Sequence, residues 1–177
     1  MMRLARLAAA AGLALALATP AAAELRFFEA VLTGDQEVPP RATPATGNAF
    51  AILDNTNNRL IISLSFTDLL GPQVAAHIHG PAAPDATAGV LIPLPLGTFV
   101  KHVIDLPPTI GAFTRKEFKG FLNDGLLYVN VHSQVFPGGE IRGHLLNVVP
   151  EPGVSALACG MGLASLWALR RRIVRAR

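Results

Sequence analysis

The central part of this chain predicts an all-β domain, an antiparallel Greek-key sandwich or barrel with one short helix. Three observations support this prediction. Short runs of β-branched and aromatic residues recur between clusters of Gly, Pro, Asn and Asp. In the clearest run, apolar and polar residues alternate with a period of two, which is typical of a strand with one buried face. A single helix-start motif stands among these runs, so we expect one helix.

The first half of the domain predicts one strand and then a hairpin. The strand covers residues 25–33 and is followed by a loop at 34–47 that contains three prolines. The hairpin strands, at 49–53 and 60–67, flank the sequence Asp-Asn-Thr-Asn-Asn at 54–58. Asp and Asn tolerate the left-handed backbone that tight hairpin turns require, so these residues indicate the turn itself.

The second half of the domain predicts five more strands. A loop rich in Gly, Pro and Ala follows the first of them, and prolines near the next two favour positions at a sheet edge. The five strands are expected, in chain order, at residues 74–79, 90–96, 99–106, 126–132 and 141–148.

The expected helix begins after Thr114. The segment Thr114-Arg115-Lys116-Glu117 has the spacing of a capping box, in which the Thr and Glu side chains satisfy free backbone N–H groups. Phe118, Phe121 and Leu122 follow at helical spacing, and Asn123-Asp124-Gly125 predicts the end of the helix.

The N-terminal residues 1–23 have the architecture of a secretory signal peptide. Arg3 and Arg6 precede an apolar run at 7–18, which is too short for a stable membrane span. Three alanines then offer a small-residue site at which signal peptidase would cleave between Ala23 and Glu24. We therefore expect export across the membrane.

The C-terminal residues 149–177 predict a membrane segment with its end in the cytoplasm. They contain Val149-Pro150-Glu151-Pro152, then an uncharged apolar run at 153–169, then Arg170-Arg171-Arg172 and two more arginines. The 17-residue run is at the short end of the range for a transmembrane helix. The arginines behind it act as a stop-transfer signal, because basic clusters stay on the cytoplasmic side.

This order of parts resembles the PEP-CTERM sorting signal of Gram-negative bacteria. The resemblance implies that a membrane protease of the exosortase type cuts near the motif. It also implies an inner-membrane intermediate, followed by release to the envelope, the cell surface or the exopolysaccharide matrix. Exopolysaccharide and surface proteins are the partners that it suggests.

Charge and cysteine content exclude two other classes of protein. Residues 24–150 contain 8 Lys and Arg against 11 Asp and Glu, and they show no basic patch interleaved with aromatic residues. This composition argues against a nucleic-acid partner. The only cysteine, Cys159, lies in the apolar tail, so the exported body must be stabilised by packing and not by disulfides.

Three segments of the body resemble the CHRD domain, a β-rich extracellular module first named from chordin. They are LTGDQEVPP at 32–40, AHIHGPA at 76–82, and YVNVHS at 128–133 running into FPGGEIRG at 136–143. The resemblance spans about residues 25–148. It departs from the family pattern at His144, where Gln is expected after the glycine.

Three histidines in these segments form a candidate metal site. His77 and His79 flank Ile78 on one predicted strand and therefore point to the same face. His132 shares a face with Tyr128 and Asn130 on another strand. Neutral imidazoles suit copper and zinc. The alternative is structural, in which the imidazoles donate to backbone carbonyls of the neighbouring loops and orient them.

The pattern is also similar to Cu/Zn superoxide dismutase, which places copper ligands on an immunoglobulin-like barrel. That similarity implies His77, His79 and His132 as the matching ligands and a superoxide-dismutase-like or immunoglobulin-like fold. Residues 80–101 contain no counterpart of the dismutase zinc loop, and no bridging histidine is present. Dismutase activity is therefore not expected.

Glu140 and Arg142 lie two residues apart on one strand face, and we expect them to form a charged pair that holds a neighbouring loop through Asp35 or Glu37. No complete set of catalytic residues appears in the body, so we do not expect an enzyme. The expected function is that of an exported, non-enzymatic binding or structural module without a cofactor. The alternative is an extracytoplasmic copper- or zinc-binding protein.

Overall fold

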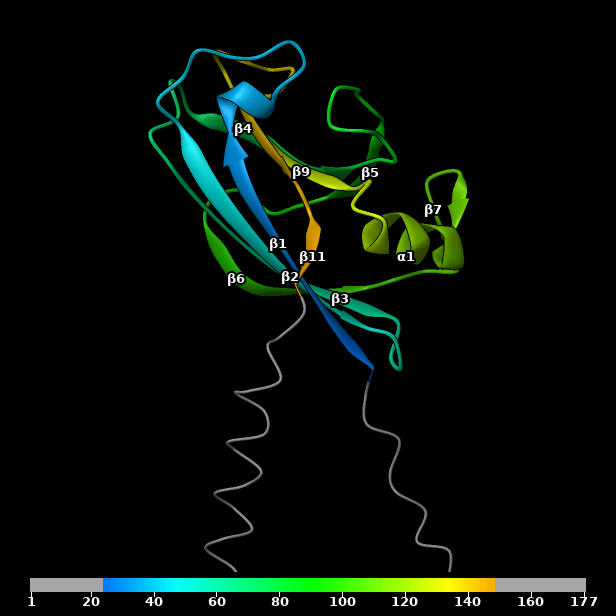
Figure 1. Ribbon diagram of the computed structural model, residues 1–177. Helices are drawn as coiled ribbons and strands as arrows, with labels where there is room; N and C mark the ends of the chain where they lie inside the picture. Colours follow the sequence, from blue (N-terminus) through cyan, green and yellow to red (C-terminus); the bar gives the residue numbers. More distant parts are fainter. Residues whose placement is uncertain (1–23, 149–177) are drawn as a thin grey trace, which may run out of the picture.

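The computed structural model describes residues 24–148 and confirms the all-β prediction. One antiparallel sheet curls into a half-barrel, and a single α-helix lies beside it (Figure 1). The strands run in the order β5-β4-β9-β10-β1-β2-β3-β6, and β11 pairs with the free part of β1. Their bounds are β1 (Leu25–Thr33), β2 (Thr46–Asp54), β3 (Arg59–Thr67), β4 (Gln73–His79), β5 (Val90–Pro93), β6 (Phe99–Asp105), β9 (Tyr128–Ser133), β10 (Ile141–His144) and β11 (Leu146–Val148).

The predicted hairpin is present as β2 and β3. Asp54 begins its turn and accepts a hydrogen bond from the backbone N–H of Asn57 at 2.9 Å. Asn58 has a positive φ of 54°, the left-handed conformation that its side chain tolerates. Alternate residues of both strands are buried, so the period of two in the sequence places one face of the hairpin in the core.

The helix α1 (Arg115–Asn123) begins at the predicted residue. Thr114 and Glu117 form both hydrogen bonds of the capping box. Phe118 and Leu122 are fully buried and belong to the same apolar cluster as Phe28, so the helix closes part of the half-barrel. Burying side chains of this size contributes about 1.5–3 kcal/mol each.

The strand predicted at 141–148 is wrong in one respect, because the structure divides it into β10 and β11. Leu145 lies between them, is fully buried, and donates its backbone N–H to Leu127 O at 2.9 Å. The chain therefore turns inward at Leu145 before β11 pairs with β1.

Gly143 in β10 packs closely against β1. A Cβ atom on Gly143 would lie 2.2 Å from the carbonyl oxygen of Val31.

Smaller elements lie in regions for which we predicted neither a strand nor a helix. They are the 3-10 helix η1 (Gly34–Gln36) and the two-stranded hairpin of β7 (Thr109–Ile110) and β8 (Phe113–Thr114). The strands β5 and β6 lie at the two edges of the main sheet, as the prolines near them predicted.

The two ends of the described domain lie side by side. Phe27 in β1 pairs with Val148 in β11, and Figure 1 shows both ends leaving the same end of the sheet. The predicted signal peptide at 1–23 and the sorting signal at 149–177, with its helix at 153–169, lie outside the described residues. Between residues 24 and 148, no helix is long and apolar enough to span a membrane.

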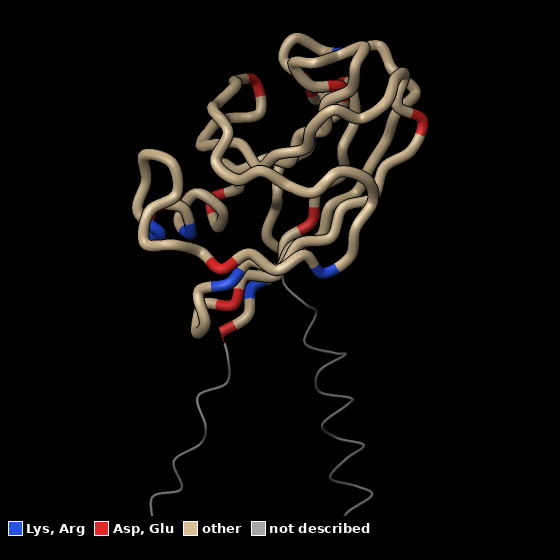
Figure 2. Tube along the Cα trace, turned by 180° about the vertical axis from the view of Figure 1, so that it is seen from behind, with Lys and Arg blue, Asp and Glu red and all other residues tan. Residues whose placement is uncertain are grey.

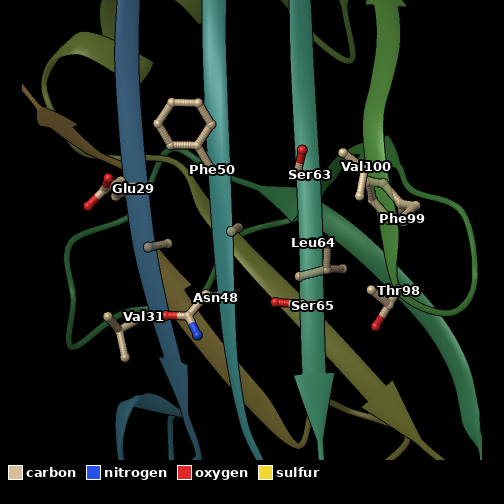
Figure 3. A pocket seen from close by; sticks show the side chains of 12 residues that line it. Glu29, Val31, Asn48, Phe50, Ser63, Leu64, Ser65, Thr98, Phe99 and Val100 are labelled. Atoms are coloured by element: carbon tan, nitrogen blue, oxygen red, sulfur yellow. The ribbon is translucent and has the colours of Figure 1, made fainter.

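Lys and Arg lie close to Asp and Glu along much of the domain. Figure 2 shows most Lys and Arg positions toward its lower end, among Asp and Glu positions and without a continuous basic stripe. A hollow of about 380 Å³ lies on the exposed face of β1, β2, β3 and β6. Phe50 and Val100 contribute apolar surface to it, and Asn48, Ser63 and Ser65 contribute polar groups (Figure 3).

Candidate metal centre

The candidate site lies on the face of β4 and β9 that points away from the apolar core. In this antiparallel pair, His77 lies opposite Asn130 and His79 lies opposite Tyr128. Opposite residues point to the same face, so both strands present their histidines together. Ile78, between the two β4 histidines, is fully buried in the core, which confirms the alternation predicted from the sequence.

The structure brings His77, His79 and His132 together. One ring nitrogen from each lies within 4.8 Å of the others. His77 Nδ1 and His132 Nε2 are 3.1 Å apart, and the centroids of the His79 and His132 rings are 5.8 Å apart. Zinc–nitrogen bonds of about 2.0–2.1 Å in tetrahedral geometry place nitrogen atoms about 3.3 Å apart. The three imidazoles therefore need only small rotations to share one ion.

Backbone carbonyl groups fix two of the three imidazoles. His79 Nδ1 lies 3.0 Å from Ala88 O, and His132 Nδ1 lies 2.9 Å from Pro137 O. A carbonyl oxygen only accepts, so each Nδ1 must carry the proton and each Nε2 must carry the lone pair. The Nε2 of His132 accepts a hydrogen bond from His77 Nδ1 at 3.1 Å. The Nε2 atom of His79 is buried and has no hydrogen-bond partner. Outer partners of this kind orient metal-binding histidines in proteins.

Burial disfavours protonation of this cluster. The side chains of His79 and His132 are only 8% and 7% exposed, whereas His77 is partly exposed at the mouth of the site. Burial lowers the pKa of all three histidines, because a charged imidazole loses its hydration there. Only neutral imidazole has the lone pair that binds a metal, so this environment favours coordination.

Tyr128 and Arg142 fasten a loop over the site. The Tyr128 ring stacks on His79, and its hydroxyl accepts a hydrogen bond from the Ala88 N–H at 3.1 Å. The Arg142 guanidinium lies 4.7 Å from the Tyr128 ring centroid and donates to Pro84 O and Ala86 O at 2.5 and 3.0 Å. The loop between β4 and β5 is thereby held against both strands.

The predicted pair of Glu140 and Arg142 is wrong, because neither ion pair found in residues 24–148 joins them. Arg142 donates to backbone carbonyls, including Gln36 O, and so joins the η1 loop to the β4–β5 loop. Glu140 accepts from the Thr43 hydroxyl and the Leu70 N–H at 2.6 and 2.8 Å. Each side chain does hold a loop, but through polar groups instead of a shared ion pair.

Glu37 is the acidic residue whose position the sequence did not predict. It is only 6% exposed, and burial raises its pKa to about 7, although the charges of Arg142 and Arg41 act in the opposite direction. Nothing in the motif around it distinguishes a buried carboxyl group from an exposed one.

The other candidate residues lie apart from the cluster. His102 is on the edge strand β6, where its ring packs against Phe99. His144 is buried next to Tyr128 and donates from Nδ1 to Gly125 O at 2.8 Å. Of the predicted processing residues, Glu24 is exposed at the start of the domain. Ala23, the motif at Val149-Pro150-Glu151-Pro152 and Arg170-Arg171-Arg172 lie outside the described range.

Fold and site together define a small antiparallel β domain that carries three convergent histidines beneath two loops. The family model for the CHRD domain matches residues 28–145, and the chain belongs to this family. No curated protein and no solved structure matches the chain.

Proposed function

We propose that this CHRD domain binds one copper or zinc ion through His77, His79 and His132. The observation that carries the proposal is the arrangement of the two buried histidines. Each uses Nδ1–H on a backbone carbonyl, which leaves the lone pair on Nε2, and one ring nitrogen from each of the three histidines lies within 4.8 Å of the others. Three neutral nitrogen ligands suit both metals.

The structural alternative explains only part of this arrangement. The hydrogen bonds to Ala88 O and Pro137 O do orient two loops, as that alternative expects. They occupy one nitrogen of each ring, and loop support needs no more than that. The hydrogen bond between His77 Nδ1 and His132 Nε2 joins two of the rings. The approach of a ring nitrogen from all three histidines to within 4.8 Å, and the buried His79 Nε2 without a partner, favour a ligand between the rings.

We also propose that the domain is related to the superoxide-dismutase-like or immunoglobulin-like barrels. Two features support this relation: a curled antiparallel sheet, and a His-x-His strand that pairs with a second strand carrying a histidine. Between residues 24 and 148, no other group of three or more His, Cys, Asp or Glu residues converges as these do. We therefore propose one metal per domain and no dismutase activity.

We propose that the domain works outside the cytoplasm as a surface or matrix module. The signal peptide at 1–23 would be removed by signal peptidase. An exosortase-type protease would then process the tail at 149–177. The start of β1 and the end of β11 lie side by side, so both signals join the domain at the same place. This arrangement suits the route, because an anchor there leaves the rest of the domain surface free to bind. Binding to exopolysaccharide or surface proteins without a metal is the second candidate function.

Metal analysis of the exported protein tests the first proposal. We expect one copper or zinc ion per chain, lost in the His77→Ala/His79→Ala variant and retained in a His102→Ala control. Added metal should raise the unfolding free energy of the wild type by about 2.7 kcal/mol at a hundredfold excess over Kd. An apo protein whose stability does not respond to copper or zinc contradicts metal binding and leaves the second candidate.

Mass spectrometry of the same protein tests the processing. We expect an N-terminus at Glu24 and a C-terminus near the Pro-Glu-Pro motif. A chain that still begins at Met1 contradicts export, and one that still ends at Arg177 contradicts cleavage of the tail.

A further inference from the structure

The exposed face of the sheet carries a hollow that is separate from the histidine cluster. It measures about 380 Å³ and lies over β1, β2, β3 and β6 (Figure 3). None of the described residues that line it belongs to the group of His77, His79 and His132. Ligand sites have volumes of about 300–1,000 Å³, so the hollow is large enough to hold a small molecule or one part of a polymer.

A β-bulge in β6 shapes one wall of this hollow. The pairing of β3 with β6 shifts register opposite Ser63, where β6 has two residues, Val100 and Lys101. Lys101 has a positive φ of 54°, which is uncommon for a residue other than Gly, Asn or Asp, and its backbone N–H donates to Ser63 Oγ at 3.0 Å. Val100 is 75% exposed and lines the hollow. Bulges often direct side chains toward functional sites in this way.

Two neighbouring rows of side chains across β1, β2 and β3 each combine an apolar group with polar ones. The rows are Val31-Asn48-Ser65 and Glu29-Phe50-Ser63. Val31 and Phe50 are 63% and 38% exposed, so a ligand can cover both. Asn48 and Ser65 are also exposed, and they offer an amide and a hydroxyl. This face therefore presents apolar surface and hydrogen-bonding groups side by side.

The polarity of the lining favours an uncharged ligand that is rich in hydroxyl groups. Glu29 is the only charged side chain among the residues of 24–148 that line the hollow, and Lys101 takes part in the bulge without being one of them. A lone carboxylate repels phosphate, nucleic acid and acidic polymers. A purely apolar partner would cover Asn48 and Ser65 without giving them hydrogen bonds, which is costly.

A hexose unit has both kinds of surface that this lining requires. Its C–H groups can lie on the ring of Phe50, because an aromatic face carries partial negative charge. Phe27 packs against Phe50 with ring centroids 6.2 Å apart, so the ring is supported from one side. The hydroxyl groups of a hexose both donate and accept, and they can therefore pair with Asn48, Ser65 and the Glu29 carboxylate.

A second hollow continues this face on the other side of β1. It also measures about 380 Å³, shares Glu29 and Val31 with the first, and extends to Gln36 and Leu146. An amide and an exposed apolar side chain are thus combined again. Neighbouring strands lie about 4.8 Å apart, which is close to the length of one hexose unit in an extended chain. The two hollows together suit a chain of sugars better than a single sugar.

We propose that this face binds a neutral polysaccharide, with a hexose unit on Phe50 and hydrogen bonds to Asn48, Ser65 and Glu29. The proposal rests on the second candidate function, the binding of exopolysaccharide, and gives it a site and a class of sugar. It does not depend on the metal.

Calorimetric titration of the exported protein with cellohexaose and with maltohexaose tests this proposal, because these two neutral hexasaccharides differ in linkage. We expect saturable binding of at least one of them, about tenfold weaker in Asn48→Ala/Ser65→Ala and in Phe50→Ala. Asn123→Ala/Thr109→Ala removes an exposed amide and an exposed hydroxyl outside both hollows, so it should bind like the wild type. Thermal unfolding checks that each variant is folded.

Three results overturn the proposal. They are the absence of saturation with both hexasaccharides, unchanged affinity in Asn48→Ala/Ser65→Ala, and equal or tighter binding of an acidic galacturonate oligomer of the same length. A wild-type dimer that dissociates in Phe50→Ala also overturns it, because the face is then an interface between two copies of the chain.

Two further measurements separate this proposal from the proposed functions. The His77→Ala/His79→Ala variant should bind the hexasaccharide normally, so failure of the metal proposal leaves this one intact. Exopolysaccharide prepared from the same cells is then mixed with the exported protein. If Asn48→Ala/Ser65→Ala is retained on it as well as the wild type, the second candidate function stands and only this face is wrong. If the wild type is not retained either, both fail.

Discussion

The rings of His79 and Tyr128 lie almost parallel across β4 and β9, with centroids 5.1 Å apart and planes inclined by 8°. Both side chains reach the same residue of the loop above them. His79 donates to Ala88 O, and the Tyr128 hydroxyl accepts from Ala88 N–H. One loop residue therefore fixes the position of a candidate ligand, and the aromatic stack holds that loop residue in place.

Tyr128→Phe should weaken the site without unfolding the domain. Phe keeps the stack on His79 but loses the hydroxyl that accepts from Ala88 N–H. Loss of one hydrogen bond lowers the unfolding free energy by about 1 kcal/mol. The loop that carries Ala88 O, the outer partner of His79, is then held less firmly, so we expect metal affinity to fall about tenfold. Urea denaturation and metal titration measure the two effects.

Tyr128→Ala is the matched comparison, because it removes the stack as well as the hydroxyl. It should cost about 3–5 kcal/mol, the range for truncating a large buried side chain. If Tyr128→Phe changes neither stability nor metal affinity, the hydroxyl does not support His79 as we infer.

Glu37→Gln should become more stabilising as the pH rises. The pKa of Glu37 is about 7 in the folded protein, above its ordinary value of 4.5, so the folded state holds this proton more tightly. The stability that Glu37 contributes is full below about pH 4.5 and is lost as the pH rises through 7. Gln does not titrate. The difference between variant and wild type should therefore shift toward the variant by roughly 3 kcal/mol between pH 4.5 and 8.

Urea denaturation of both proteins at several pH values measures this difference. The buried histidines have lowered pKa values, so the folding stability that their neutral forms contribute is lost as the pH falls below 6.5. That trend is common to both proteins and cancels in the comparison. A difference that stays constant from pH 5 to 8 contradicts a raised pKa for Glu37.

Gly139→Ala should be strongly destabilising, and Gly138→Ala is its control. Gly139 has a φ of 127°, and a Cβ atom there would lie 2.6 Å from Asn130 Nδ2 and 2.8 Å from Glu37 Oε1. Strain and overpacking each cost about 1–3 kcal/mol. A Cβ atom at Gly138 meets nothing within 4 Å, so that variant should lie within about 1 kcal/mol of the wild type. Thermal unfolding of the pair decides, and equal stabilities contradict the close packing at Gly139.

Local sequence patterns predicted those parts of the structure that depend on neighbouring residues. The period of two placed His77, His79 and His132 on one side of their strands, and the capping box of Thr114 and Glu117 located the start of the helix. Both follow from the geometry of a single strand or a single helix turn. The pairing of β4 with β9 then brought the histidines together.

Local sequence patterns could not predict contacts between side chains and distant backbone groups. The carbonyl groups of Ala88 and Pro137, which set the proton positions on His79 and His132, belong to residues whose side chains give no signal. The break at Leu145 depends on its contact with Leu127, which lies in a distant segment. Arg142 was assigned to a carboxylate because sequence shows charges, whereas the structure offers it three carbonyl oxygens.

Arg142→Lys should be among the most damaging substitutions in the domain, even though it keeps the charge. Arg142 is 1% exposed, donates to carbonyl groups of two loops, and lies over the Tyr128 ring. Lys presents one compact ammonium in place of a planar fork of donors, so it cannot reach both loops. Carbonyl groups without a partner cost about 1–3 kcal/mol each, and we expect a total loss of about 3 kcal/mol or more.

Arg59→Lys provides the control, because the same change is made at an exposed ion pair. The Arg59 side chain is 50% exposed and bonds Asp105 at the surface, so its replacement should cost less than about 1 kcal/mol. Hydrogen exchange should also show faster exchange in both loops of Arg142→Lys, because the guanidinium is the group that joins them. Equal stabilities of the two variants, or unchanged loop exchange, would mean that the η1 loop and the β4–β5 loop are held together by contacts other than those of Arg142.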